Sequence, residues 1–417
     1  MLSWCDRPAS APACLAAGAL RHSAGTSVHR VESLDSLRGV AAMVVVLCHV
    51  IEALPHPIGD VFAEPWKVIP GLPGWINTAR AVTSYLPLRL TWAGLEAVLL
   101  FFVLSGYVLA QPFLRGAAPA WRTFAGRRLC RLYLPYLAAL FVALVARDVM
   151  MRTVGLVPGI SWMHPAPVKL IAQQMALAGG SDSFHINGVV WSLVHEIRIS
   201  LIFPLLMLLL LRTSPLVCLA ASFAIAIPAF HYVPQASLDT FAGQFELSLA
   251  GTLAYGSFFV LGASAALAYP AFSRLREITG AAGDAFLFLA SLVLLNADGS
   301  FGPRISSHQG TMHLLEGLGA AGMILLAAGH TFVRRALHWP PLLWVGRVSF
   351  SLYLSHYVLF LVLWCLLGPA LGIVVTLLTC LPVAALFYRL VEAPTIQLGH
   401  RYFGTSVRPD AATQPQI

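Results

Sequence analysis

Charged residues are scarce in this sequence. Only 11% of the residues are Asp, Glu, Lys or Arg, whereas soluble domains are about 25% charged. Hydrophobic residues make up 58% of the 417 positions, and the mean hydropathy is +0.77. This amount of charge is too small to cover the surface of a soluble protein of this length. The composition therefore indicates a polytopic membrane protein.

Cysteine is also rare. The seven cysteines are odd in number and widely spaced, at positions 5, 14, 48, 130, 218, 365 and 380. Such spacing predicts neither a disulfide framework nor a zinc site. We therefore expect no metal and no permanently bound cofactor, and we interpret these cysteines as packing residues.

Long apolar runs are abundant. Runs of about 20 residues predict an all-α bundle of about ten membrane-spanning helices. The expected spans are 36–56, 91–113, 131–150, 189–211, 214–231, 248–269, 283–297, 312–332, 342–367 and 371–391.

Basic residues predict the orientation. With the N-terminus inside, 18 of the 26 Lys and Arg fall in cytoplasmic segments and seven in outer segments, so the positive-inside rule places both termini in the cytoplasm. Anionic membrane lipids account for the formal charge of +8, and no nucleic-acid partner is expected. We expect residues 1–30 to be a disordered cytoplasmic tail, 31–400 the membrane domain and 401–417 a cytoplasmic C-terminal tail.

The first span contains two ionisable residues on one face. Arg38 and His49 are eleven residues apart, which is about 16 Å along a helix and within about 20° of the same side. Ionisable groups inside a membrane usually face a bundle interior or a cavity, and they are functional candidates. The alternatives are a lipid anchor for Arg38 and a hydrogen-bonded structural histidine for His49.

Three further spans carry polar residues. Arg128 and Arg131 share a face at the start of the third span, where they either anchor the helix or bind a phosphorylated ligand. Glu196 lies in the outer half of the fourth span, as a structural ion-pair partner or a catalytic group. Trp191, nearby, is either a membrane-interface residue or a stacking platform for a sugar.

The fourth polar stretch, "RVSFSLYLSHYVLF" at 347–360, places a stripe along one helix face. Ser349, Tyr353 and His356 follow one another at intervals of four and three residues. The two hydroxyl groups are explained equally well as bridges between helices.

Taken together, these stretches resemble the acyltransferase 3 family of integral membrane acyltransferases. The resemblance covers roughly residues 33–400. Its motifs are "LDSLRGVAAMVVVLCH", "FFVLSGYVL", "RRLCRLYLP", "WSLVHEIRISLIFP", "FFVLGA", "SFSLYLSHY" and "RLVEAP", in family order. This resemblance makes 31–400 a transmembrane acyltransferase domain.

The resemblance implies transfer of an acyl group, usually acetyl, from cytoplasmic acetyl-CoA or another acyl-CoA to a hydroxyl of a glycan or lipid-linked sugar. It implies a donor site at Arg38, Arg128 and Arg131, and catalysis by His49 and Glu196. Trp191, Tyr353, His356 and Ser349 are expected to bind the acceptor or support the site. The expected location is the bacterial inner membrane.

The spacing is compatible with that chemistry. The distance of about 16 Å from Arg38 to His49 is comparable to an extended pantetheine arm, so phosphates at the inner face could place a thioester near His49. His49 would act as a base or as a transient acyl carrier, and Glu196 would orient it. The alternative function is a proton-coupled transporter, or a carrier that moves acyl groups to a separate transferase.

Overall fold

The computed structural model describes residues 31–52, 74, 77–78, 82, 86–157, 161–163, 166–178, 186–232, 241–297 and 309–404. Helices joined by short connections make up these residues, which confirms the all-α fold class. The predicted tail at 1–30, and residues 405–417 of the predicted C-terminal tail, lie outside the described residues.

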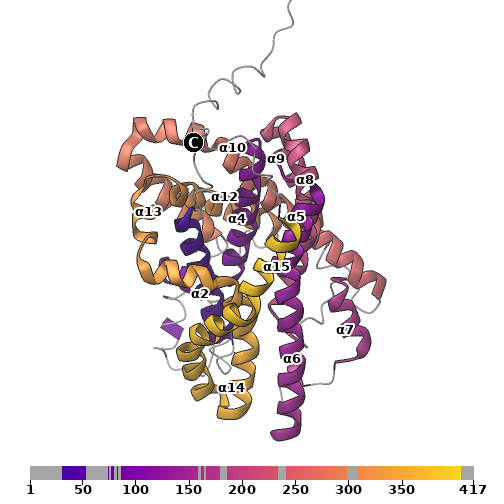
Figure 1. Cartoon of the computed structure of the whole chain (residues 1–417). Helices are drawn as coiled ribbons and strands as arrows, with labels where there is room; N and C mark the ends of the chain where they lie inside the picture. Colours follow the sequence, from indigo (N-terminus) through magenta and orange to yellow (C-terminus); the bar gives the residue numbers. More distant parts are fainter. Residues whose placement is uncertain are drawn as a thin grey trace, which may run out of the picture.

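The long helices form one bundle (Figure 1). They are α2 (Glu32–Glu52), α4 (Gly94–Leu114), α6 (Leu134–Thr153), α8 (Val190–Arg212), α9 (Pro215–Tyr232), α10 (Phe241–Leu295), α12 (Gln309–Ala328) and α14 (Pro340–Phe387). The shorter helices are η2 (Leu88–Thr91), α5 (Trp121–Arg128), η4 (Ser161–Met163), α7 (Val168–Met175), α13 (Phe332–Leu337) and α15 (Ala393–Phe403).

Seven helical stretches of the described residues are long and apolar enough to cross a membrane. Two of them are broken at glycines with positive φ, Gly280 in α10 and Gly368 in α14. These breaks lie between predicted spans 248–269 and 283–297, and between 342–367 and 371–391. The apolar helix α9 corresponds to predicted span 214–231. Each predicted span therefore overlaps a helical segment, and the number of crossings stays a prediction.

The centre of the bundle is α4, which packs against α2, α10 and α12 (Figure 1). Its residues Leu99 and Leu104 are fully buried, and Phe102 is 1% exposed. On the other side of α2 lies α14. A buried central helix is expected when apolar residues occupy its whole circumference.

Two glycines bring α2 and α14 into close contact. A Cβ atom at Gly39 would lie 2.7 Å from the backbone nitrogen of Gly346. Small residues allow such close backbone approach between membrane helices. Arg38 directly precedes Gly39, and Arg347 directly follows Gly346. The contact therefore brings both arginines to the same helix crossing.

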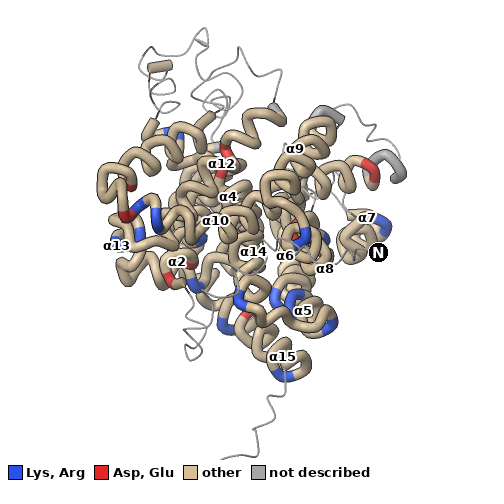
Figure 2. The backbone as a smooth tube through the Cα atoms, turned by 90° about the horizontal axis from the view of Figure 1, so that it is seen from above, with Lys and Arg blue, Asp and Glu red and all other residues tan. Residues whose placement is uncertain are grey.

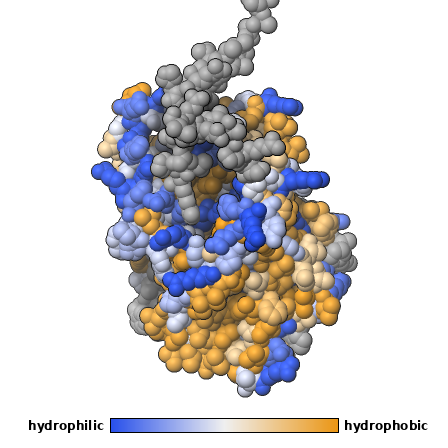
Figure 3. All heavy atoms as spheres, viewed as in Figure 1, coloured by the Kyte–Doolittle hydropathy of each residue, from blue (hydrophilic) through white to orange (hydrophobic). Residues whose placement is uncertain are grey.

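A broad apolar surface covers α6 and the second half of α14. Hydrophobic residues dominate the lower part of Figure 3, where these helices lie in Figure 1. The exposed apolar side chains there are Phe141, Val142, Val145, Val149, Leu371, Val374, Leu378 and Leu386. Such a surface is stable in contact with lipid tails and agrees with an integral multi-pass membrane protein.

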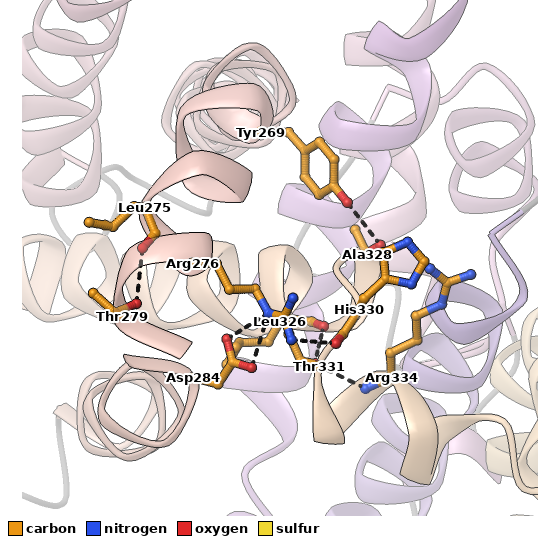
Figure 4. A network of polar contacts seen from close by, with 10 residues as sticks. All are labelled: Tyr269, Leu275, Arg276, Thr279, Asp284, Leu326, Ala328, His330, Thr331 and Arg334. Carbon is orange, nitrogen blue, oxygen red and sulfur yellow. Dashed lines mark hydrogen bonds and ion pairs between the residues drawn. The ribbon is translucent and has the colours of Figure 1, made fainter. Parts of the chain in front are cut away.

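An ion pair braces the break in α10 (Figure 4). The Nε atom of Arg276 lies 3.0 and 3.1 Å from the two carboxylate oxygens of Asp284, on the other side of Gly280. The same arginine donates to the carbonyl of His330, between α12 and α13. The brace therefore fixes the angle of the break against the following helices.

Two turns of π-helix interrupt otherwise α-helical stretches. The first, η3 (Leu129–Tyr133), joins α5 to α6, and the second, η8 (Tyr388–Glu392), joins α14 to α15. Helix α15 contacts both turns. Because π turns are rare and occur often at functional sites, this region is a candidate location for a site.

Candidate functional site

A cavity of about 230 Å³ lies between α2, α4, α5, α8, α14, α15 and the two π turns. It collects residues from almost the whole length of the chain. Its lining consists of Arg38, Val98, Phe101, Phe102, Ser105, Val108, Arg128, Arg131, Leu132, Ser192, Glu196, Gly346, Arg347, Ser349, Phe350, Tyr353, Tyr388, Glu392, Ile396 and His400.

Four arginines line one end of this cavity, which we call the basic end. Arg38, Arg128 and Arg131 are the three donor-site residues predicted from the sequence, and Arg347 joins them. Arg38 also pairs with Asp35 at 3.1 Å. In Figure 2, Lys and Arg occur on α2, α5 and α15 and beside α13. A cluster of guanidinium groups suits phosphate oxygens, which they can bind in a bidentate manner.

The first π turn orients Arg131 and contributes Leu132 to the lining, and the second contributes Tyr388 and Glu392. Arg127 of α5 holds the neighbouring helix in place by donating to the carbonyl of Phe403, at 3.0 Å. Helix α15, the last helix of the described residues, therefore forms one wall of the basic end.

Two carboxylates face the cavity, and each accepts a hydrogen bond from a serine. The Ser105 hydroxyl lies 2.9 Å from Glu196, and the Ser351 hydroxyl lies 2.5 Å from Glu392. Glu196 is in electrostatic contact with Arg128, while Glu392 interacts with Arg131 and Arg38. The carboxylates offset part of the positive charge, so that four arginines can share one partly buried space.

The opposite end of the cavity, which we call the deep end, is lined mainly by aromatic and aliphatic side chains, with Ser192 hydrogen-bonded to Tyr353 beside them. Val98, Phe101 and Phe102 of α4 line it, together with Tyr353 of α14. The ring of Phe101 meets the ring of Tyr353 edge-on, with 5.8 Å between centroids. A polar entrance followed by an apolar end fits a ligand with a charged head and a small apolar tip.

Hydrogen bonds hold Tyr353 in place. Its hydroxyl donates to the carbonyl of Val189 at 2.8 Å and accepts from Ser192 at 2.6 Å. Ser349, one turn earlier, donates to the carbonyl of Gly346 at 2.8 Å and also lines the cavity. The predicted stripe thus faces the cavity at Ser349 and Tyr353, although both hydroxyls bond to the protein.

His49 and His356 lie together just beyond Tyr353. Their rings stack with centroids 5.5 Å apart, and the His356 centroid is 6.1 Å from that of Tyr353. His356 donates through Nδ1 to the carbonyl of Leu352 at 2.9 Å, which leaves Nε2 as the atom with a lone pair. His49 also contacts the ring of Tyr357. Neither histidine belongs to the cavity lining.

Trp191 lies on another face of α8. It packs against Tyr255 of α10 and against His195, with ring centroids 5.6 and 6.2 Å away. Ser192 and Glu196 of the same helix face the cavity instead. The structure therefore separates Trp191 from Glu196, and the expected acceptor role of Trp191 stays a prediction.

The sequence interpretation assigns no role to six polar residues of the cavity lining, which are Ser105, Ser192, Arg347, Tyr388, Glu392 and His400. Arg347 opens "RVSFSLYLSHYVLF", Glu392 lies in "RLVEAP" and Ser105 lies in "FFVLSGYVL". A buried glutamate near the end of an apolar helix was the available signal for Glu392, which is only 4% exposed. Among the described residues, no group of three or more His, Cys, Asp or Glu could hold a metal ion.

Comparison with known proteins gives one match. The sequence model of the acyltransferase domain of the acyltransferase 3 family matches residues 31–389, which is most of the chain. No curated protein and no solved structure matches. The chain therefore belongs to the acyltransferase 3 family and is an integral membrane acyltransferase.

Proposed function

We propose that this protein is a membrane O-acetyltransferase. It takes an acetyl group from cytoplasmic acetyl-CoA and transfers it to a hydroxyl of a cell-surface or envelope glycan, in the inner membrane of a bacterium. The family supports acyl transfer in general. The observation that carries the donor assignment is the cavity, which has four arginines at one end and aromatic and aliphatic side chains at the other.

The basic end holds the donor. Arg38, Arg128, Arg131 and Arg347 bind the phosphates of CoA at the cytoplasmic face, because such a charged group is too costly to bury in lipid without partners. The slender pantetheine arm enters the cavity and carries the thioester towards Tyr353. No part of CoA needs to cross the membrane.

His49 supplies the base. The acceptor oxygen attacks the thioester carbonyl carbon, the carbon–sulfur bond breaks, and the proton that His49 removes from the hydroxyl passes to the CoA thiolate. Glu196 supports the step from the cavity wall, where its negative charge favours a transient imidazolium. Tyr353, His356 and Ser349 shape the passage, and Trp191 is the proposed contact for the acceptor sugar.

The position of His49 favours a second candidate. His49 stacks on His356, which lies against Tyr353 of the cavity wall, so the acetyl group could first move to the imidazole and leave from there. The protein would then carry acyl groups across the membrane to a separate transferase. Purified protein that acetylates the glycan without a second enzyme would contradict this carrier function.

The test uses membranes that contain the protein, labelled acetyl-CoA and the glycan fraction of the same bacterium. Replacing Arg128 and Arg131 with Ala should raise the KM for acetyl-CoA at least about tenfold, while the KM for the glycan changes less than about twofold. Arg122→Ala is the matched control, because Arg122 is exposed on α5 and lies outside the cavity lining. An unchanged donor KM would mean that the arginines only anchor the helix.

A further inference from the structure

The cavity has a direction along α4. Its lining residues on this helix run from Val108 to Val98, a distance of about 15 Å at 1.5 Å per residue. The arginines of α2 and α14 belong to one end, since Arg38 and Arg347 are the chain neighbours of Gly39 and Gly346, whose backbones are in close contact. Tyr353, two turns further along α14, closes the other end together with Phe101.

The aromatic side chains that line the deep end differ in how many contacts fix their positions. Two hydrogen bonds fix Tyr353. Phe102 is 1% exposed and packs against Tyr255 and Phe259 of α10, with centroids 5.0 and 5.9 Å away. Phe101 is only half-buried and touches the deep end with its ring. It packs against two buried apolar clusters only from their edge, so its removal would enlarge the cavity at a smaller cost to the core than removal of Phe102.

The room beyond the arginines is small. Between Val108 and Val98 the lining spans about 15 Å along α4. A pantetheine arm that follows the helix fills most of this length, so that only a short acyl group fits between Val98, Phe101 and Tyr353.

We propose that Phe101 sets the length of the acyl group that this protein accepts. The inference rests on the proposed function, in which the CoA phosphates bind at the basic end. Phe101 closes the deep end against chains longer than a few carbons, and Val98 forms the side of the same compartment. The donor is thus a short-chain acyl-CoA.

The experiment measures the Kd of free CoA, acetyl-CoA, butyryl-CoA and hexanoyl-CoA for the full chain in detergent. Wild-type protein should bind hexanoyl-CoA at least about tenfold more weakly than acetyl-CoA. Phe101→Ala should shift this ratio at least about tenfold towards hexanoyl-CoA. Phe113→Ala is the control, since Phe113 is a half-buried phenylalanine of the same helix that packs against Phe124 and Phe203 outside the cavity lining.

The outcomes separate the two proposals. If the wild-type chain binds neither CoA nor any acyl-CoA, the proposed donor is wrong, and the length assignment falls with it. If it binds CoA but shows the same length preference after Phe101→Ala, only the role of Phe101 is wrong. Phe101→Leu, a smaller change, gives the same test should the alanine variant fail to fold, and an unchanged preference in that variant overturns the inference equally.

Discussion

Binding and chemistry are assigned to different residues in this molecule. The arginines line the cavity, whereas His49 lies behind Tyr353, stacked on His356. A substitution at His49 removes no side chain from the cavity wall. Donor binding and acyl transfer should therefore be separable by single substitutions.

His49→Ala should lower acetyl transfer at least about 100-fold, because a positioned general base contributes that much or more. The Kd of acetyl-CoA should stay within about twofold of the wild-type value. Transfer of label to the glycan fraction and direct titration of acetyl-CoA check the two statements. A His49→Ala protein that transfers acetyl at the wild-type rate would remove this histidine from the mechanism.

Glu392 opposes the charge of the arginines, and its replacement should tighten anion binding. In Glu392→Gln the side-chain oxygen can still accept from Ser351, but one negative charge near Arg131 and Arg38 is lost. We expect the Kd of CoA to fall about fivefold at low salt and the difference to shrink at high salt.

Glu277→Gln, on the exposed surface of α10, is the control and should leave the Kd of CoA unchanged. Weaker CoA binding by Glu392→Gln would show instead that Glu392 orders the arginines. Either change in affinity would be larger than that of the control.

Six of the residues that line the cavity were candidates from the sequence, but the sequence did not indicate which candidates face the cavity and which face other helices. Trp191 and Glu196 are five residues apart, which places them about 140° apart around a helix. One therefore faces α10 and the other the cavity. Which face meets which neighbour depends on the packing of distant helices, and the sequence of one helix carries no signal for that.

At the scale of helices, the contact between α2 and α14 positions the basic end. Gly39→Ala places a methyl group within 2.7 Å of the Gly346 backbone, and backbone atoms cannot move aside as a flexible side chain can. We expect a loss of about 1–3 kcal/mol in the free energy of unfolding. The Kd of CoA should also rise, because Arg38 and Arg347 move apart.

Gly256→Ala is the matched control for that variant. Gly256 lies inside α10, and a Cβ atom there meets nothing within 4 Å. Since alanine favours helix over glycine, its Tm should be equal to or above that of the wild type. Thermal unfolding of both variants in detergent tests the comparison, and equal Tm values would argue against a tight crossing.

Helix positions were predicted well because length and apolar character alone determine them. The broken helices show the limit of this reasoning. Gly280 and Gly368 separate predicted spans, yet the chain continues as helix on each side of them without a long loop. The angle at Gly280 depends on Asp284 and Arg276, whose pairing is a tertiary contact.

At the scale of the whole molecule, the orientation in the membrane is a prediction that can be tested with cysteines. Ala117, exposed between α4 and α5, and Leu156, 65% exposed after α6, lie at opposite ends of the bundle. A membrane-impermeant maleimide should label Leu156→Cys in intact cells, and should label Ala117→Cys only after the cells are opened.

The wild-type chain, labelled in parallel, measures the background from its own cysteines. Of these, Cys48, Cys130 and Cys380 are buried and Cys218 and Cys365 are half-buried. Labelling of Ala117→Cys in intact cells, with Leu156→Cys protected, would reverse the orientation and place the basic end outside.

The two π turns have a consequence for relatives of this protein. A π turn holds one residue more than an α turn, so each resembles a single-residue insertion that rotates the rest of the helix by about 100°. A homologue that lacks this extra residue would present a different side chain in place of Arg131 or Glu392. Alignments should therefore allow a one-residue gap within 129–133 and within 388–392. Deleting one residue in either turn would change which side chains line the cavity while leaving the composition of the helix almost unchanged.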